Sequence, residues 1–382
     1  MRPSSALGRL VTLACLAVAC APSSPPPRPV GGALDDLARD AAPLADTRET
    51  TDAAPDATSE TIGEEVDASV DAAPEVLAAL PPMTEEDVVV HRELKISAVE
   101  TCATPDVPPE GSPEINEAID VEYAAMGGES QRLDVAWPKT AGPHPLVVII
   151  HGGGWSAGTR ELYRKDTRRL ASIGYVAATI DYRLCNKAKN RFPAGIVDTR
   201  CAVRWLRSRA AVYGIDRARV VALGASAGGH LAAMLGVESD LAELDGDCPV
   251  RDQPVSVSGV ASYYGPIDVR TPSKTYKGIM VKGVEEFLGA PAEDVPKLAK
   301  LASPIAYVDA KDPPFLLLHG VDDTIIPIEE SRRFLKALKK AKVPSFLLEI
   351  EGDKGMHGFP ILVTTRPRVT CTTLAFLAAA TK

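Results

Sequence analysis

The stretch from Arg219 to Met234 constrains the fold of this chain more than any other part of its 382 residues. A short apolar, partly β-branched run reaches Gly224, and beyond Ser226 the composition becomes rich in alanine and leucine. This change predicts a buried strand that leads through a tight turn into a helix. Gly224, Ser226 and Gly228 form the pattern G-x-S-x-G on that turn.

The two glycines of this pattern have a mechanical role. A serine on so sharp a turn is strained and projects outward, and side chains at positions 224 and 228 would collide with the neighbouring strand and helix. Ser226 would then lie exposed at a helix N-terminus, where the Ala227 N–H and the helix dipole point towards any oxyanion. The alternative is a glycine-rich turn that only packs closely, because short motifs often match by accident. Other segments must decide between the two.

Apolar runs alternate with helical patterns from about residue 85 onwards. Residues 145–150 are continuously apolar, which is typical of a strand buried on both faces of a parallel sheet, whereas 131–137 alternate as an antiparallel strand does. The order predicts an α/β fold with a mostly parallel sheet of about eight strands and helices on both faces. Further strands are expected at 88–90, at 119–123 with Ile119, Val121 and Tyr123 on one face, and at 175–180, 220–223, 257–263, 314–318 and 344–350; helices are expected at 161–173, 194–213, 227–236, 328–342 and 366–380.

The region before this domain has a different composition. Residues 21–80 are rich in Ala, Pro, Asp, Glu, Ser and Thr, and their 13 acidic against 3 basic residues account for the net charge of −9. This predicts a disordered acidic linker over 21–84, followed by a folded domain over 85–382. The domain itself is near neutral and has no basic stripe interleaved with aromatics, so we expect no nucleic-acid partner.

The N-terminus predicts an export signal. Arg2 and Arg9 precede an apolar run at 10–19 that is too short to span a bilayer, and Cys20 follows it. Residues 1–20 resemble a bacterial lipoprotein signal, in which the cysteine is acylated and becomes the first mature residue. The resemblance implies a lipid anchor at Cys20 as the only membrane contact, in the bacterial cell envelope on the outer membrane. Plain secretion after nearby cleavage is the alternative.

Cysteine usage agrees with an oxidising compartment. Five of the seven cysteines remain if Cys15 is removed and Cys20 is lipidated, so up to two disulfides can form with one thiol left over. Their spacing does not determine the pairing. No C-x-x-C, H-E-x-x-H or Cys/His cluster at ligand spacing occurs, so we expect no metal and no cofactor.

Three segments that follow apolar runs have distinctive residues, and sites in parallel sheets lie outside the carboxyl ends of strands. The first is the glycine-rich segment 151–155, where the N–H groups of Gly153 and Gly154 could donate to an oxyanion; one such donor contributes about 3 kcal/mol. Its histidine, His151, is expected to be a structural hydrogen-bonding residue. Trp155 either binds substrate or supports the loop.

The other two segments supply an acid and a base. Asp322 and Asp323 follow the run 314–318, and His357 follows the last run. With a serine on such a turn, a catalytic triad runs in the order Ser, acid, His, and of six histidines only His357 follows these acids. His230 lies one turn along the helix from the serine and does not face it across the site.

From about residue 117 to 380 the chain resembles the α/β-hydrolase superfamily, specifically HGGGW-containing esterases related to hormone-sensitive lipase and to bacterial acetyl-xylan and feruloyl esterases. The resemblance implies Ser226 as nucleophile, His357 as base, Asp323 as the orienting acid with Asp322 second, and Gly153, Gly154 and Ala227 as the oxyanion hole. The matching stretches are His151 to Trp155, Asp181 to Leu184, Phe192 to Ala194, Ala202 to Arg207, Tyr213 to Asp216, Gly224 to His230, and His319-Gly320 with Asp323.

Departures from the lipase pattern narrow the resemblance. Ala225 stands where hormone-sensitive-lipase-like sequences carry an acidic residue, which favours the acetyl-xylan and feruloyl side. Asp198 and Arg200 are most simply ion-pair residues. With only the insertion 266–300 after the nucleophile, we expect an open site and a serine carboxylesterase for short acyl groups on small molecules or plant polysaccharide. The alternatives are an arylformamidase, a serine peptidase, or a non-catalytic carbohydrate-binding lipoprotein.

Overall fold

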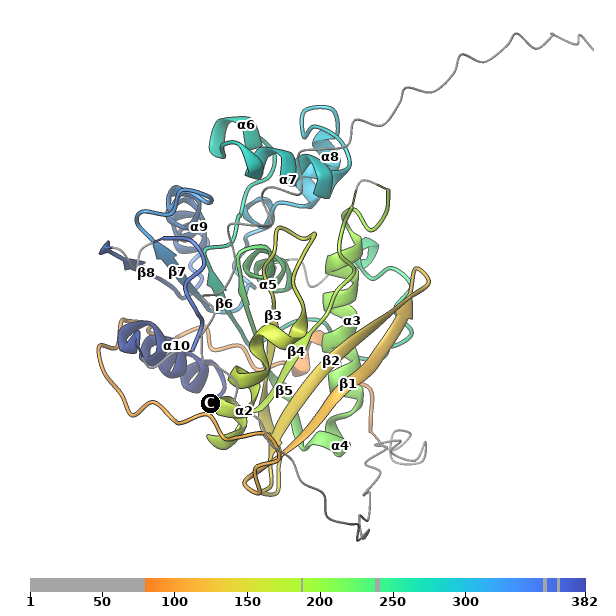
Figure 1. Cartoon of the computed structure of the whole chain (residues 1–382), viewed down its shortest axis with the longest axis vertical. Helices are drawn as coiled ribbons and strands as arrows, with labels where there is room; N and C mark the ends of the chain where they lie inside the picture. Colours follow the sequence, from red (N-terminus) through yellow and green to blue (C-terminus); the bar gives the residue numbers. More distant parts are fainter. Residues whose placement is uncertain (1–79, 187, 238–240, 353–355, 363–364) are drawn as a thin grey trace, which may run out of the picture. The chain divides into compact units, whose positions relative to one another are not determined.

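The computed structural model describes residues 80–382 except 187, 238–240, 353–355 and 363–364 (Figure 1). The predicted signal peptide, Cys20 and nearly all of the predicted linker lie outside the described residues. Among the residues that are described, none of the helices has the length and apolar character needed to cross a bilayer.

A single sheet of eight strands organises the described part of the chain. Its order is β1-β2-β4-β3-β5-β6-β7-β8, with β1–β2 and β2–β4 antiparallel and every other pair parallel. The mostly parallel sheet predicted from the apolar runs is confirmed. The strands are β1 Ile115–Met126, β2 Glu129–Pro138, β3 His144–Ile150, β4 Val176–Ile180, β5 Ile215–Ala225, β6 Gly259–Tyr263, β7 Phe315–Gly320 and β8 Ser345–Ile350.

Helices cover both faces of this sheet, as predicted. The long predicted helix over 194–213 is interrupted at Arg209, so it forms two helices. The α-helices are α2 Arg164–Ser172, α3 Ala194–Ser208, α4 Ala210–Tyr213, α5 Ala227–Val237, α6 Pro272–Thr275, α7 Ile279–Leu288, α8 Pro296–Leu301, α9 Glu329–Lys340 and α10 Pro367–Ala380, and the 3-10 helices are η1 Glu85–Asp87, η2 Arg160–Tyr163, η3 Ala242–Leu244 and η4 Pro304–Ala306.

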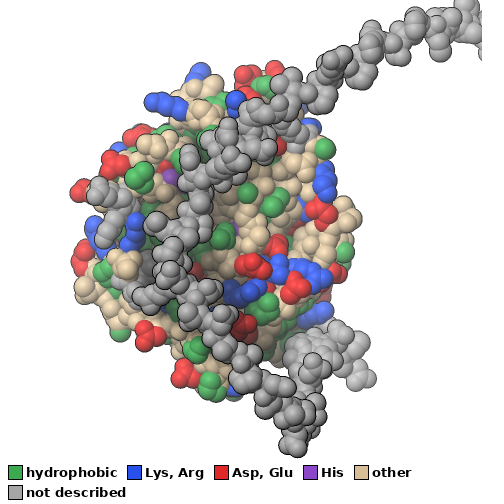
Figure 2. All heavy atoms as spheres, viewed as in Figure 1, with side chains coloured by type: hydrophobic (Ala, Val, Ile, Leu, Met, Phe, Trp, Pro, Cys, Tyr) green, Lys and Arg blue, Asp and Glu red, His purple; other side chains and the backbone are tan. Residues whose placement is uncertain are grey.

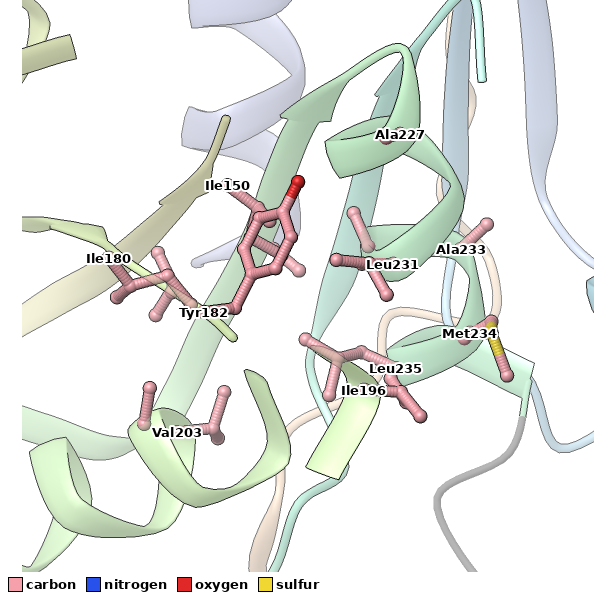
Figure 3. Packing of buried hydrophobic residues seen from close by; sticks show 14 of the residues in the cluster. Ile150, Ile180, Tyr182, Ile196, Val203, Ala227, Leu231, Ala233, Met234 and Leu235 are labelled. Atoms are coloured by element: carbon pink, nitrogen blue, oxygen red, sulfur yellow. The ribbon is translucent and has the colours of Figure 1, made fainter. Parts of the chain in front are cut away.

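Strand β3 shows how the apolar run serves two cores. Leu146, Val148 and Ile150 join the cluster that includes side chains of α3, α5 and α9, whereas Val147 and Ile149 join the cluster with α2 and α10. Successive side chains of a strand point to opposite faces, so both faces need apolar residues. Figure 3 shows the first cluster, in which residues of β3, β4, α3 and α5 pack together.

Two predictions near the start of the domain are wrong. Residues 88–90 form no strand; they follow η1, and the Val89 N–H makes a single backbone hydrogen bond of 3.0 Å to Ala218. In β1, the pairing with β2 shifts register between Ala118 and Val121, so Ile119 is 40% exposed while Tyr123 is buried. The extra residue of a β-bulge reverses the alternation that placed these side chains on one face.

Two disulfides tie distant segments together. Cys102 pairs with Cys371 of α10, and Cys201 of α3 pairs with Cys248, leaving Cys185 free and buried. This is the maximum number of bridges that the five cysteines allow. A native disulfide typically contributes about 2–4 kcal/mol to the free energy of unfolding by restricting the unfolded chain.

Candidate active site

The turn between β5 and α5 has the predicted strained geometry. Ser226 has a φ of 55°, in the left-handed region that is costly for a residue with a side chain. A Cβ at Gly224 would lie 2.2 Å from the carbonyl oxygen of Gly228, and a Cβ at Gly228 would lie 2.1 Å from that of Ile150. Both contacts are with backbone atoms, which cannot rotate away as a flexible side chain can. Glycine is therefore required on each side of the serine, which lets α5 pack directly against β3.

The structure brings Ser226, His357 and Asp323 together from the ends of β5, β8 and β7. His357 Nε2 lies 3.0 Å from Ser226 Oγ, and His357 Nδ1 lies 2.7 Å from Asp323 Oδ2. In the neutral imidazole, Nδ1–H donates to the carboxylate and Nε2 accepts from the serine hydroxyl. Asp322, the second candidate for the acid, is exposed. In this arrangement the Asp323 carboxylate can stabilise a protonated His357, and His357 can accept the proton of the Ser226 hydroxyl.

The carboxylate of Asp323 is fully buried and held by several donors. Its Oδ1 accepts from the N–H groups of Ile325 and Ile326, both at 2.9 Å. His319 Nε2 lies 3.4 Å from Oδ2, beside the bond from His357. Burial alone raises the pKa of Asp323, but the hydrogen bonds from His319 and His357 outweigh it and hold the pKa far below its usual range. Asp323 is therefore ionised at neutral pH and can stabilise an imidazolium.

Tyr264 is a site residue that the sequence analysis missed. It follows β6, has a φ of 40°, and donates from its hydroxyl to the carbonyl of Phe359 at 2.8 Å. Its ring lies edge-on to His357 with 4.7 Å between ring centroids. Because it stands at the carboxyl end of an apolar run, the same signal that selected the other segments could have identified it.

The glycine loop lies directly against the serine. A Cβ at Gly152 would be 3.2 Å from Ser226 Cβ. Gly153 and Gly154 have φ values of 112° and 58°, which side chains rarely adopt. Ala227 is the first residue of α5, and the N–H groups of a helix's first turn have no acceptor within the helix. The structure thus brings Gly152 and Ala227 next to Ser226 and places Gly153 and Gly154 on the adjoining loop; the oxyanion hole itself stays a prediction.

The side chains of Trp155 and His151 are buried beneath this loop. Trp155 is 2% exposed, stacks on Phe287 with 4.2 Å between centroids, and donates to His230. Its surface is almost wholly used by protein contacts, which favours the supporting role over substrate contact; the latter stays a prediction. His151 is buried, lies 2.7 Å through Nδ1 from the carbonyl of Gly152 and stacks on Tyr182, as expected of a structural histidine.

Asp198 and Arg200 of α3 form ion pairs, as the sequence predicted. Asp198 pairs with Arg183 at 2.7 Å, and Arg200 pairs with Asp245 at 2.6 Å.

On the face shown in Figure 2, acidic and basic side chains of the described residues are interspersed. Within the described part of the chain, no three His, Cys, Asp or Glu side chains are grouped as metal ligands.

The comparisons with known proteins identify esterases among the relatives of this chain. Residues 133–338 match the model of the BD-FAE family. The chain is 32% identical over 254 residues to the esterase LipC of Mycobacterium tuberculosis and 31% identical over 257 residues to the esterase LipQ of the same organism. These alignments cover 64% and 65% of this chain. The chain spans about three fifths of the length of these curated relatives, 61% and 59%.

Solved structures share the fold. A truncated carbohydrate esterase from gut microbiota superposes with a TM-score of 0.61 at 24% identity and covers 72% of this chain and 100% of its own. A propionate-bound esterase of Thermogutta terrifontis superposes with a TM-score of 0.56 at 26% identity and covers 71% of this chain and 93% of its own. The α/β-hydrolase fold predicted from the sequence is confirmed.

Proposed function

The chain belongs to the BD-FAE family, and from this premise we propose that it is a serine carboxylesterase that works through an acyl-enzyme. The hydrogen-bonded series from Ser226 through His357 to Asp323 carries the proposal. The esterase relatives and the glycine loop against the serine support it. Because binding alone does not require all three side chains in this order, the geometry favours an enzyme over a non-catalytic carbohydrate-binding protein.

In the proposed reaction, His357 transfers protons between Ser226, the leaving alcohol and water. Ser226 Oγ attacks the ester carbonyl carbon while His357 Nε2 takes its proton, and the oxyanion rests on the N–H groups of Gly153, Gly154 and Ala227. His357 then gives this proton to the alcohol oxygen, which leaves. A water molecule attacks the acyl-enzyme and gives a proton to His357, which returns it to Ser226 Oγ as the acid departs.

Short acyl groups are the proposed substrates. The Thermogutta terrifontis esterase has been solved with propionate and with butyrate, and the neighbour from gut microbiota is described as a carbohydrate esterase. Among the described residues that follow the nucleophile, one sizeable segment, which includes α6, α7 and α8, is inserted. These observations support an open site for acetyl or feruloyl esters of plant polysaccharide as well as for small-molecule esters.

A chain-length series tests this function. With the purified protein, kcat/KM should fall from p-nitrophenyl acetate through butyrate to a long-chain ester, because a short acyl group needs no extended pocket. Acetylated xylan and a feruloylated oligosaccharide would then be compared by release of the free acid. Preference for the matching anilide or formanilide over the ester would move the function to the peptidase or arylformamidase class.

We also propose that the protein is attached to the bacterial envelope through lipidated Cys20. The lipoprotein-like signal over residues 1–20 and two disulfides in the described domain support an exported protein. Cys20→Ser should shift the protein from the detergent phase to the aqueous phase in a phase-partition experiment, because it removes the acylation site. The exported wild-type protein in the aqueous phase would indicate plain secretion instead.

A further inference from the structure

We propose that His230 is a positioning residue that joins Trp155 of the glycine loop to the nucleophile helix and so fixes where the N–H groups of Gly153 and Gly154 point. The inference rests on the proposed esterase function. It concerns a histidine that takes no part in the triad, and it assigns a purpose to the buried aromatic cluster beneath the loop.

His230 is tied to the nucleophile through the backbone. It lies on the first turn of α5, and its N–H donates to the carbonyl of Ser226 at 3.0 Å. Its side chain is fully buried. The imidazole is therefore anchored on the same helical turn that carries Ser226 and Ala227.

The tautomer of the imidazole follows from its second partner. Nε2 lies 2.9 Å from the carbonyl of Ala302, which can only accept, so Nε2 carries the proton. Nδ1 is then an acceptor, and it receives the Trp155 Nε1–H at 3.2 Å. Burial lowers the pKa of His230 to about 4, so the ring is neutral at neutral pH and keeps this acceptor.

Trp155 passes this constraint to the loop. It directly follows Gly154 and has a φ of 60°, and its carbonyl accepts from the Cys185 N–H at 2.8 Å. Its indole stacks on Phe287 of α7 with 15° between the ring planes. Stacking fixes the plane of the indole, and the bond to His230 fixes its rotation within that plane.

The hydrogen bond between Trp155 and His230 connects the two segments that form the proposed oxyanion hole. Ala227 is on α5 with His230, whereas Gly153 and Gly154 are on the loop with Trp155. The donors act together only if their relative positions match the oxyanion, and a misplacement of about 1 Å can cost about 100-fold in rate. Stacking on Phe287 alone does not fix the position of the glycine loop relative to α5, because a stacked ring can slide in its own plane.

Two polar substitutions at position 230 separate positioning from packing. The amide oxygen of His230→Asn lies near the position of Nδ1 and can still accept from Trp155, whereas His230→Gln can still donate to Ala302 but has no acceptor at that position. We expect roughly a 10–100-fold loss of kcat for the Gln variant and a smaller loss for the Asn variant, with KM within about twofold in both. Equal kcat values, or a lower value for the Asn variant, would overturn the proposal.

Trp155→Phe supplies the second measurement. It keeps a ring on Phe287 but removes the N–H, so kcat should fall roughly 10–100-fold and the Ki of a trifluoromethyl ketone, which forms an oxyanion adduct, should rise in parallel. Trp205→Phe on α3, another buried tryptophan, is the matched control and should leave both unchanged.

All rates are expressed per active site titrated with a phosphonylating agent, which corrects for unfolded protein. A lower Tm with unchanged kcat and Ki in Trp155→Phe would show that the cluster only stabilises the fold. The ester hydrolysis of the wild-type protein is measured first, so a failure of the proposed function is distinguished from a failure of this inference.

Discussion

Ser226→Ala should lower kcat for p-nitrophenyl acetate by at least about 10⁴-fold, because the substitution removes the hydroxyl that we propose as the nucleophile. The hydroxyl lies 3.0 Å from His357 Nε2, and alanine keeps the Cβ that the strained turn already accommodates. The fold should therefore stay intact, with Tm within a few degrees of the wild type. Steady-state hydrolysis and a thermal melt on the same preparation measure both quantities.

The control for this variant is Ser208→Ala, on α3, where the serine hydroxyl donates to the carbonyl of Trp205. It should retain wild-type kcat. Activity of Ser226→Ala above the contamination level, at the kcat/KM profile of the wild type, would assign the nucleophile to another residue. Loss of activity in both variants would point to damage from handling rather than to chemistry.

The position of the site could be predicted because a parallel sheet collects the carboxyl ends of its strands along one edge. The glycine loop follows β3, Ser226 follows β5, Asp323 follows β7 and His357 follows β8, so chain order and strand direction were enough to place them together. The strands predicted at 145–150, 220–223 and 314–318 are confirmed, because a strand buried on both faces of a parallel sheet is continuously apolar. The apolar run at 88–90 is too short to join the sheet and forms no strand.

The rest depended on contacts that no local pattern contains. The bulge that exposes Ile119 arises from how β1 pairs with β2, and the partner of Cys102 is 269 residues away. The choice between Asp322 and Asp323 needed family resemblance, because two adjacent carboxylates are equivalent in sequence. Only the structure shows one of them buried beneath His357 and the other exposed.

This difference between two adjacent aspartates leads to the second large effect. Asp323→Asn should reduce kcat about 10⁴-fold, because the amide would present an N–H₂ donor to His357 Nδ1 and favour the tautomer that carries its proton on Nε2. In that tautomer the imidazole cannot accept the proton of Ser226. The amide oxygen can still accept from Ile325 and Ile326, so the loop should keep its conformation.

Asp322→Asn is the matched control one position away. It changes the same carboxylate to the same amide on the same loop, but at an exposed side chain, so kcat should stay within about twofold of the wild type. The comparison uses kcat at saturating p-nitrophenyl acetate, with KM measured separately. If the ranking were reversed, the acid role would belong to Asp322, and His357 would have to turn away from the 2.7 Å bond that it makes with Asp323. The two variants therefore test whether this bond is the one that holds the base in its active tautomer.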